Sequence, residues 1–110
     1  MSFKVKTTPE FERSVKKIAK KHKSIRKDIS ELINQLEQEP RLGIQLGNNL
    51  YKIRLGISGS SKDKSGGVRV ITYVKFLKST VILTDIYLKS EFDTVDEAVI
   101  IKRLIAGNLI

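Results

Sequence analysis

The stretch VRVITYVKF, residues 68–76, decides the fold. Valine, threonine and phenylalanine occupy every second position, and successive side chains of a β-strand point to opposite faces of its sheet. Strict alternation of this kind predicts a half-buried strand. One face carries Val68, Val70, Thr72, Val74 and Phe76, and the other carries Arg69, Ile71, Tyr73 and Lys75.

Two further stretches, residues 51–55 and 81–88, alternate in the same way. The links between the three stretches are a Gly-, Ser- and Lys-rich segment at 56–67 and a turn at 78–79. Consecutive strands with such links predict an antiparallel meander. In the last strand, strict alternation places Ile82, Thr84, Ile86 and Leu88 on one face, opposite Val81, Leu83, Asp85 and Tyr87.

Two helical segments precede the meander. Thr8 and Pro9 form a helix start, because threonine caps a helix N-terminus and proline fits its first position. Apolar residues follow at helical spacing, and a second segment runs from Ser24 to about Glu37. The connection at residues 21–24 is short enough for an antiparallel helical hairpin.

Three shorter features complete the pattern. Residues 2–6 alternate and predict a short strand, whereas residues 41–49 contain Gly43, Gly47 and two asparagines and predict a loop. Thr94 and Glu97 match a capping box, which predicts a last helix. The apolar face of that helix is expected to carry Ala98, Ile101, Leu104 and Ile105.

This order of elements predicts one domain, residues 1–110, of the α+β class. We expect an N-terminal strand and a helical hairpin packed on a twisted antiparallel sheet, followed by a C-terminal helix. The helices cover one face of the sheet and leave the second face of the meander free, where cations and a tyrosine suit a phosphodiester. That face is expected to carry Lys52, Arg54, Arg69, Asp85 and Tyr87, flanked by Lys62, Lys64 and Lys89.

The composition excludes several kinds of site. The chain has no cysteine, so it has no disulfide, thiol nucleophile or cysteine-based zinc site. His22 is its one histidine, and we expect it to close the first helix, where the helix dipole favours a cation. No apolar stretch approaches the ~20 residues of a membrane span. We expect a soluble cytoplasmic protein with no metal, no cofactor and no membrane partner.

The charge is concentrated in two regions. The chain carries 21 basic and 12 acidic residues, a net charge of +9. Residues 1–30 hold ten basic and three acidic residues, for +7, and residues 52–89 hold eight and two, for +6. The helical region is either a solvated lysine face or a docking surface for a nucleic-acid backbone. The docking interpretation assigns it Lys16, Lys17, Lys20 and Lys21.

Four segments, taken in order, carry a resemblance to a known family. They are Leu50–Arg54, the basic run Lys62–Lys64, Ser65–Tyr73 and Ile86–Glu91. Their order and spacing resemble the RelE/ParE toxin superfamily, and within it the HigB-like RelE toxins. Leu88 and Ser90 depart from the pattern, because many HigB-like members carry Gly and Asn there.

The resemblance implies the toxin half of a bacterial type II toxin–antitoxin pair. It implies a ribosome-dependent, metal-independent endoribonuclease that cleaves mRNA and is bound by an antitoxin with an acidic, partly disordered segment. The RelE branch of the superfamily cleaves mRNA in the ribosomal A site, whereas the ParE branch poisons DNA gyrase. A non-catalytic ParE-like gyrase inhibitor, or a degenerate inactive member, is therefore the alternative.

Cleavage of RNA by its own 2′-hydroxyl needs a base, cations for the developing phosphorane and an acid for the leaving oxygen. Arg69 and Arg54 are the candidate phosphate clamps, because a guanidinium matches phosphate oxygens at two points. Tyr87 is a candidate to stack on a base or position the sugar. Additional cations or proton donors are expected among Lys52, Lys62, Lys64 and Lys89, and Glu91 is a possible base.

Each candidate also has a structural interpretation. Arg69 on a strand is compatible with an ordinary surface residue, Tyr87 with a packing residue, and Glu91 with an ion pair to a nearby lysine. Convergence of these residues on one sheet face distinguishes the functional interpretation from the structural one.

Overall fold

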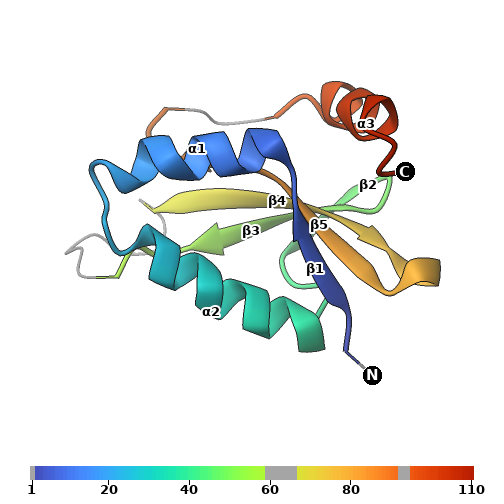
Figure 1. Ribbon diagram of the computed structural model, residues 1–110, viewed down its shortest axis with the longest axis horizontal. Helices are drawn as coiled ribbons and strands as arrows, with labels where there is room; N and C mark the ends of the chain where they lie inside the picture. The colour runs from blue at the N-terminus through green and yellow to red at the C-terminus, as the bar shows by residue number, and fades with distance from the viewer. Residues whose placement is uncertain (1, 59–66, 92–94) are drawn as a thin grey trace.

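The computed structural model describes residues 2–58, 67–91 and 95–110, and it confirms the α+β class (Figure 1). Its helices are α1 (Pro9–Ala19), α2 (Ile25–Gln38) and α3 (Glu97–Ala106). Its strands are β1 (Lys4–Thr7), β2 (Ile44–Gly47), β3 (Leu50–Leu55), β4 (Val68–Lys75) and β5 (Thr80–Leu88), and a 3-10 turn, η2 (Phe76–Lys78), joins β4 to β5.

The strands form one five-stranded sheet in the order β1-β5-β4-β3-β2. The meander from β3 to β5 is antiparallel, as the alternation predicts. The first strand differs from the expected antiparallel pattern, because β1 pairs in parallel with β5. The sheet is therefore mixed, with its one parallel pair at the β1 edge.

The segment 41–49, expected to be a loop, contains the strand β2. It pairs antiparallel with β3, and the two strands are joined through Asn48 and Asn49, whose φ angles are 52° and 65°. Positive φ at both central residues is the geometry of a tight hairpin turn, and asparagine tolerates it. The residues that favour a loop by composition here build a hairpin turn.

The helical hairpin lies across one face of the sheet. Thr8 caps α1, since its side-chain oxygen accepts a hydrogen bond from the Phe11 backbone N–H at 3.1 Å. Both helices are amphipathic and pack their apolar faces on the sheet, which gives the main core. Its buried residues are Phe11, Val15, Ile18, Ile25, Ile29, Leu32, Leu36, Tyr51, Ile53, Val68, Val70, Val74, Val81, Leu83 and Ile86.

A β-bulge interrupts the alternation of β5. Ile71 pairs with Asp85 and Thr72 pairs with Leu83, so Thr84 is an extra residue on β5. The bulge is held from both sides: the Thr84 hydroxyl donates to the Ile71 carbonyl, and the Thr84 carbonyl accepts from the Thr8 hydroxyl, each at 3.2 Å. The prediction that Ile82 and Ile86 share a face is therefore wrong.

The second face of the sheet is partly covered by α3, which corrects the prediction that this face is free. Ile100 and Leu104 of α3 pack on Ile71, Ile82 and neighbouring sheet residues. These apolar residues on the second face are the physical reason that a helix covers it. The remaining buried members of this second cluster are Leu50 and Tyr87.

The start and the buried face of α3 also differ from expectation. Its N-cap is Asp96, whose Oδ1 accepts from the N–H groups of Ala98 and Val99 at 3.0 and 3.3 Å. Thr94, the expected cap, lies outside the described residues. Ala98 and Ile105, expected on the apolar face, are exposed, so the packed face is centred on Ile100 and Leu104.

Candidate nucleic-acid interface

Three of the candidate residues form one row across adjacent strands. Arg54 of β3 pairs directly with Arg69 of β4, and Arg69 pairs directly with Tyr87 of β5. Residues that lie directly opposite each other in a sheet project from the same face, about 5 Å apart. The register therefore brings two arginines and a tyrosine from three strands together.

Lys89 lies beside this row. Its backbone N–H donates to the carbonyl of Gly67 at 3.1 Å, just before the start of β4. Gly67 has no room for a side chain, because a Cβ there would clash with the carbonyl oxygen of Leu55. The glycine thus allows the ends of β3 and β4 to approach closely, and β5 extends past them toward Lys89.

The row differs in exposure from one end to the other. Arg54 is exposed, whereas Arg69 is 4% exposed and Tyr87 is 7% exposed. The Arg69 Nη1 donates to the carbonyl of Val68 at 3.2 Å. A guanidinium is a permanent cation, so Arg69 places positive charge just below the surface, where the field is less screened than in water.

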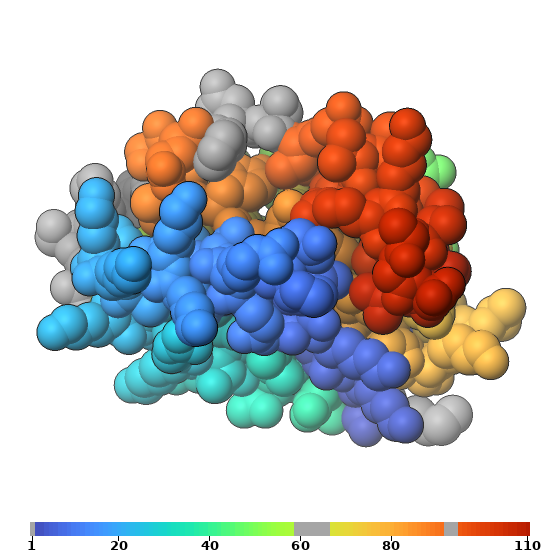
Figure 2. Space-filling model, turned by 45° about the horizontal axis from the view of Figure 1, so that its top comes forward, coloured from blue at the N-terminus to red at the C-terminus, as the bar shows by residue number. Residues whose placement is uncertain are grey.

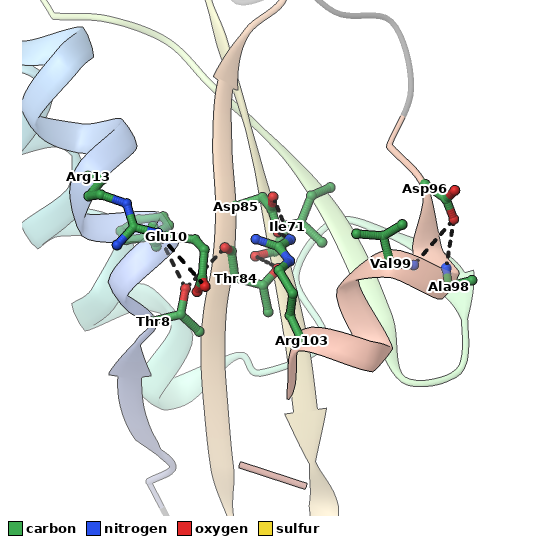
Figure 3. A network of polar contacts seen from close by, with 11 residues as sticks. Thr8, Glu10, Arg13, Ile71, Thr84, Asp85, Asp96, Ala98, Val99 and Arg103 are labelled. Atoms are coloured by element: carbon green, nitrogen blue, oxygen red, sulfur yellow. Dashed lines mark hydrogen bonds and ion pairs between the residues drawn. The ribbon is translucent and has the colours of Figure 1, made fainter. Parts of the chain in front are cut away.

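Asp85, expected on the same face as the cations, is engaged elsewhere. Its carboxylate accepts two hydrogen bonds from Nη2 of Arg103 on α3, at 2.7 and 2.9 Å (Figure 3). Burial raises the pKa of Asp85, although the charge of Arg103 and the hydrogen bonds that Arg103 donates oppose that rise. Asp85 therefore anchors α3 to the sheet, a role for Arg103 that no sequence pattern indicated.

A pocket of about 400 Å³ lies between the start of α1 and the end of α3. Figure 2 shows α1, in blue, beside α3, in red, on this side of the molecule. Thr84, the extra residue of the bulge, forms part of its wall together with Arg103 and Leu104. The pocket is thus separate from the row formed by Arg54, Arg69 and Tyr87.

The lysines expected on the first helix all face solvent. Lys16, Lys17, Lys20 and Lys21 are exposed, while Phe11, Val15 and Ile18 on the opposite side of the helix are buried. The turn between α1 and α2 lies at the same end of the molecule as the end of β3 and the start of β4 (Figure 1). Part of each basic region therefore lies at this end of the fold, namely the α1–α2 turn and the ends of β3 and β4 beside it (Figure 1).

The other candidates have mixed outcomes. Lys52 is half-buried on β3, and Glu91 is exposed. Lys62 and Lys64 lie outside the described residues. His22 lies in the turn between the helices, where its N–H donates to the Ile18 carbonyl and its carbonyl accepts from the Ile25 N–H.

Two features are absent from the part of the chain that the structure describes. No three histidine, cysteine or acidic side chains lie together there in a geometry that would hold a metal ion. None of the helices described has the length and the apolar composition to cross a bilayer.

Comparison with known proteins identifies solved structures with a similar fold. No family model and no curated protein matches the sequence. Among solved structures, a mutant of the E. coli toxin RelE in the free state is similar, with a TM-score of 0.58 and 19% identity over 83% of this chain and 87% of that chain. The isolated E. coli RelE toxin is similar over 94% of this chain and 99% of that chain, with a TM-score of 0.55 and 18% identity.

A third similar structure is the RelE mutant in complex with a peptide of the antitoxin RelB. Its TM-score is 0.53, with 18% identity over 78% of this chain and 82% of that chain. At such identities the likeness concerns the arrangement of helices and strands. With three helices and a five-stranded sheet in this arrangement, the chain has the fold of the RelE toxin.

Proposed function

We propose that this chain is the toxin of a type II toxin–antitoxin pair and that it cleaves mRNA on the ribosome, in the cytoplasm, without a metal ion. The observation that carries the proposal is the row of Arg54, Arg69 and Tyr87, with Lys89 beside it, on a RelE-like fold. The HigB-like subtype is part of the proposal and rests on the sequence resemblance alone.

The chemistry follows from where these groups lie. Arg54 is exposed and is placed to bind a phosphate oxygen directly, while the buried charge of Arg69 stabilises the negative charge that develops on the phosphorane. Lys89 adds a cation beside them or protonates the leaving oxygen. Tyr87 positions the nucleotide, and Lys52, Lys62 and Lys64 supply further charge.

A second candidate function is non-catalytic, either inhibition of gyrase or an inactive toxin. One observation favours it: Arg69 and Tyr87 are almost fully buried, so neither side chain offers much surface to a substrate. Under the catalytic proposal these two residues act mainly through charge and through the shape of the site.

We also propose an antitoxin as the partner. One of the similar structures holds a peptide of an antitoxin, and a net charge of +9 on 110 residues favours an acidic segment that folds on binding.

The test is cell-free translation with mapping of the mRNA ends, with and without ribosomes. We expect cuts that require ribosomes and that are lost in Arg54→Ala, whose exposed side chain is not needed for folding. Arg54→Lys, which keeps the charge but loses the two-point contact, is the matched variant and should retain partial cleavage. Intact mRNA combined with gyrase-dependent DNA breaks would instead establish the second candidate.

A further inference from the structure

Asp28, in the first turn of α2, is a buried carboxylate that reaches outside its own helix. It is 3% exposed. Its Oδ2 accepts from the backbone N–H of Ser58 at 2.9 Å, and its Oδ1 accepts from the Ser58 hydroxyl. Ser58 follows β3, so the carboxylate ties the start of α2 to the end of that strand.

Ser24 belongs to the same linkage, and its hydroxyl does not cap α2 as a serine at this position usually does. It occupies the N-cap position of α2, yet its side chain caps no backbone N–H of the helix. Instead its hydroxyl lies 2.7 Å from the carbonyl of Ser58 and 3.4 Å from Asp28 Oδ2. A residue that departs from its local structural preference in this way often has a functional role.

The linkage joins two groups of cations. On the helical side, the exposed residues Lys23, Arg26 and Lys27 lie next to Ser24 and Asp28 in the sequence. On the sheet side, Arg54 precedes Ser58 by four residues and is also exposed. These hydrogen bonds therefore fix exposed charges of the helical hairpin relative to the candidate row on the sheet.

We propose that Asp28 is a positioning residue that holds these two groups of cations in one orientation, so that a single RNA backbone contacts both. This inference rests on the proposed function, because it assigns RNA as the ligand. Once one group has bound the RNA, contact with the second becomes an intramolecular step, and its benefit depends on a fixed geometry. A loose connection would leave each group to bind independently.

The test is a double-mutant cycle between the linkage and the helical cations. Asp28→Asn is combined with Arg26→Ala/Lys27→Ala, and the affinity for a labelled single-stranded RNA is measured together with KM and kcat for mRNA on ribosomes. We expect Asp28→Asn to weaken RNA binding and raise KM by about three- to tenfold, with kcat nearly unchanged. We expect the loss from Arg26→Ala/Lys27→Ala to shrink in the Asp28→Asn background.

Two comparisons separate positioning from simple loss of stability. Ser58→Thr keeps the hydroxyl and the N–H and should behave like the parent, whereas Ser58→Ala should resemble Asp28→Asn. Leu36→Ala removes buried apolar contacts in the last turn of α2, at the opposite end of that helix from Asp28, so it should lower the melting temperature and leave the RNA affinity of the folded protein unchanged.

Additive effects in the cycle, or equal loss of RNA affinity in Leu36→Ala at a temperature where the chain is folded, would overturn the inference. If the parent bound RNA but cleaved none, the proposed ribonuclease would fail while the affinity cycle still decided the role of Asp28. A parent chain that bound no RNA would overturn both.

Discussion

The two faces of the sheet are covered in different ways. The hairpin of α1 and α2 spans one face and buries fifteen of the described residues in a single cluster, whereas α3 covers part of the other face with a cluster of six. The first contact is a large apolar cluster, with hydrogen bonds from Thr8 to Thr84 and between Asp28 and Ser58 at its margins. The second combines a small apolar patch with the ion pair between Asp85 and Arg103.

This difference separates stability from function. Burial of apolar area is the main source of folding free energy, so the hairpin face supplies most of it. The partial cover on the other face leaves room for Arg54 to stay exposed beside the buried Arg69. Substitutions on the hairpin face should therefore cost more stability and affect more of the fold than substitutions on the α3 face.

The largest effect is expected on the hairpin face. Leu36 is completely buried in the large cluster, so Leu36→Ala should lower the free energy of unfolding by about 2–5 kcal/mol, from lost burial and from the cavity left behind. Urea denaturation measures the loss, and Leu36→Met, which conserves volume, is the control. A loss below that of the α3 variant described next would contradict the comparison.

The corresponding change on α3 should cost less. Leu104 packs in the small cluster and also borders the pocket between α1 and α3, so the site already adjoins open space and Leu104→Ala should cost about 2 kcal/mol, at the lower limit for such changes. Amide hydrogen exchange should rise in α3 and remain slow in β4. Faster exchange throughout the sheet would show that a substitution on α3 loosens the whole fold, and it would contradict the difference between the two faces.

A smaller and pH-dependent effect is expected at Asp85. Burial raises its pKa in the folded chain above the ordinary 3.8, so the folded state binds this proton more tightly than the unfolded state does. That contribution to stability is fully present below pH 3.8 and is lost as the pH rises through the raised pKa.

Asp85→Asn removes this titration. At a pH above the raised pKa, the free energy of unfolding of this variant should differ from that of the parent by about 1 kcal/mol, the scale of one hydrogen bond. Thermal unfolding from pH 3 to pH 7 measures the difference between the two proteins as a function of pH. A constant difference across the range would show that Asp85 does not titrate as described.

The smallest effect is expected for a surface pair on α1. Arg13 and Glu10 approach to 3.9 Å, with 70% and 37% of their side-chain surfaces exposed. Pairs that water reaches in this way contribute little, because water screens them. Glu10→Gln should change the free energy of unfolding by less than about 0.5 kcal/mol. A larger change in chemical denaturation would indicate that Glu10 contributes to the wall of the neighbouring pocket.

The sequence predicted the elements whose periodicity is long and regular. The helical hairpin and the meander follow from apolar spacing, and alternation in β3 and β4 correctly placed Arg54 and Arg69 on one face. Alternation failed in β5, because one extra residue at Thr84 shifts the phase and leaves no mark in composition. The same pattern cannot distinguish a turn of asparagines within a hairpin from an irregular loop, so β2 was missed.

The sheet face that carries Arg54 and Arg69 was predictable from the sequence, but the exposure of these residues was not. The face of a strand residue follows from periodicity, whereas the burial of Arg69 depends on how neighbouring segments, distant in sequence, pack around it. The roles of Asp28 and Arg103 were missed for the same reason. Each binds a residue from another element, Ser58 or Asp85, and a single sequence carries no signal for that pairing.

The extra residue at Thr84 reverses which residues of β5 face the helical hairpin. Before it, odd-numbered residues of β5 face the helical hairpin, and after it even-numbered residues do, as Leu83 and Ile86 demonstrate. The residue opposite Arg69 is Tyr87 only because of this shift, since an uninterrupted ladder would put Ile86 there. Deleting Thr84 should instead make the ladder regular and keep Tyr87 opposite Arg69, because Asp85 would then follow Leu83 directly.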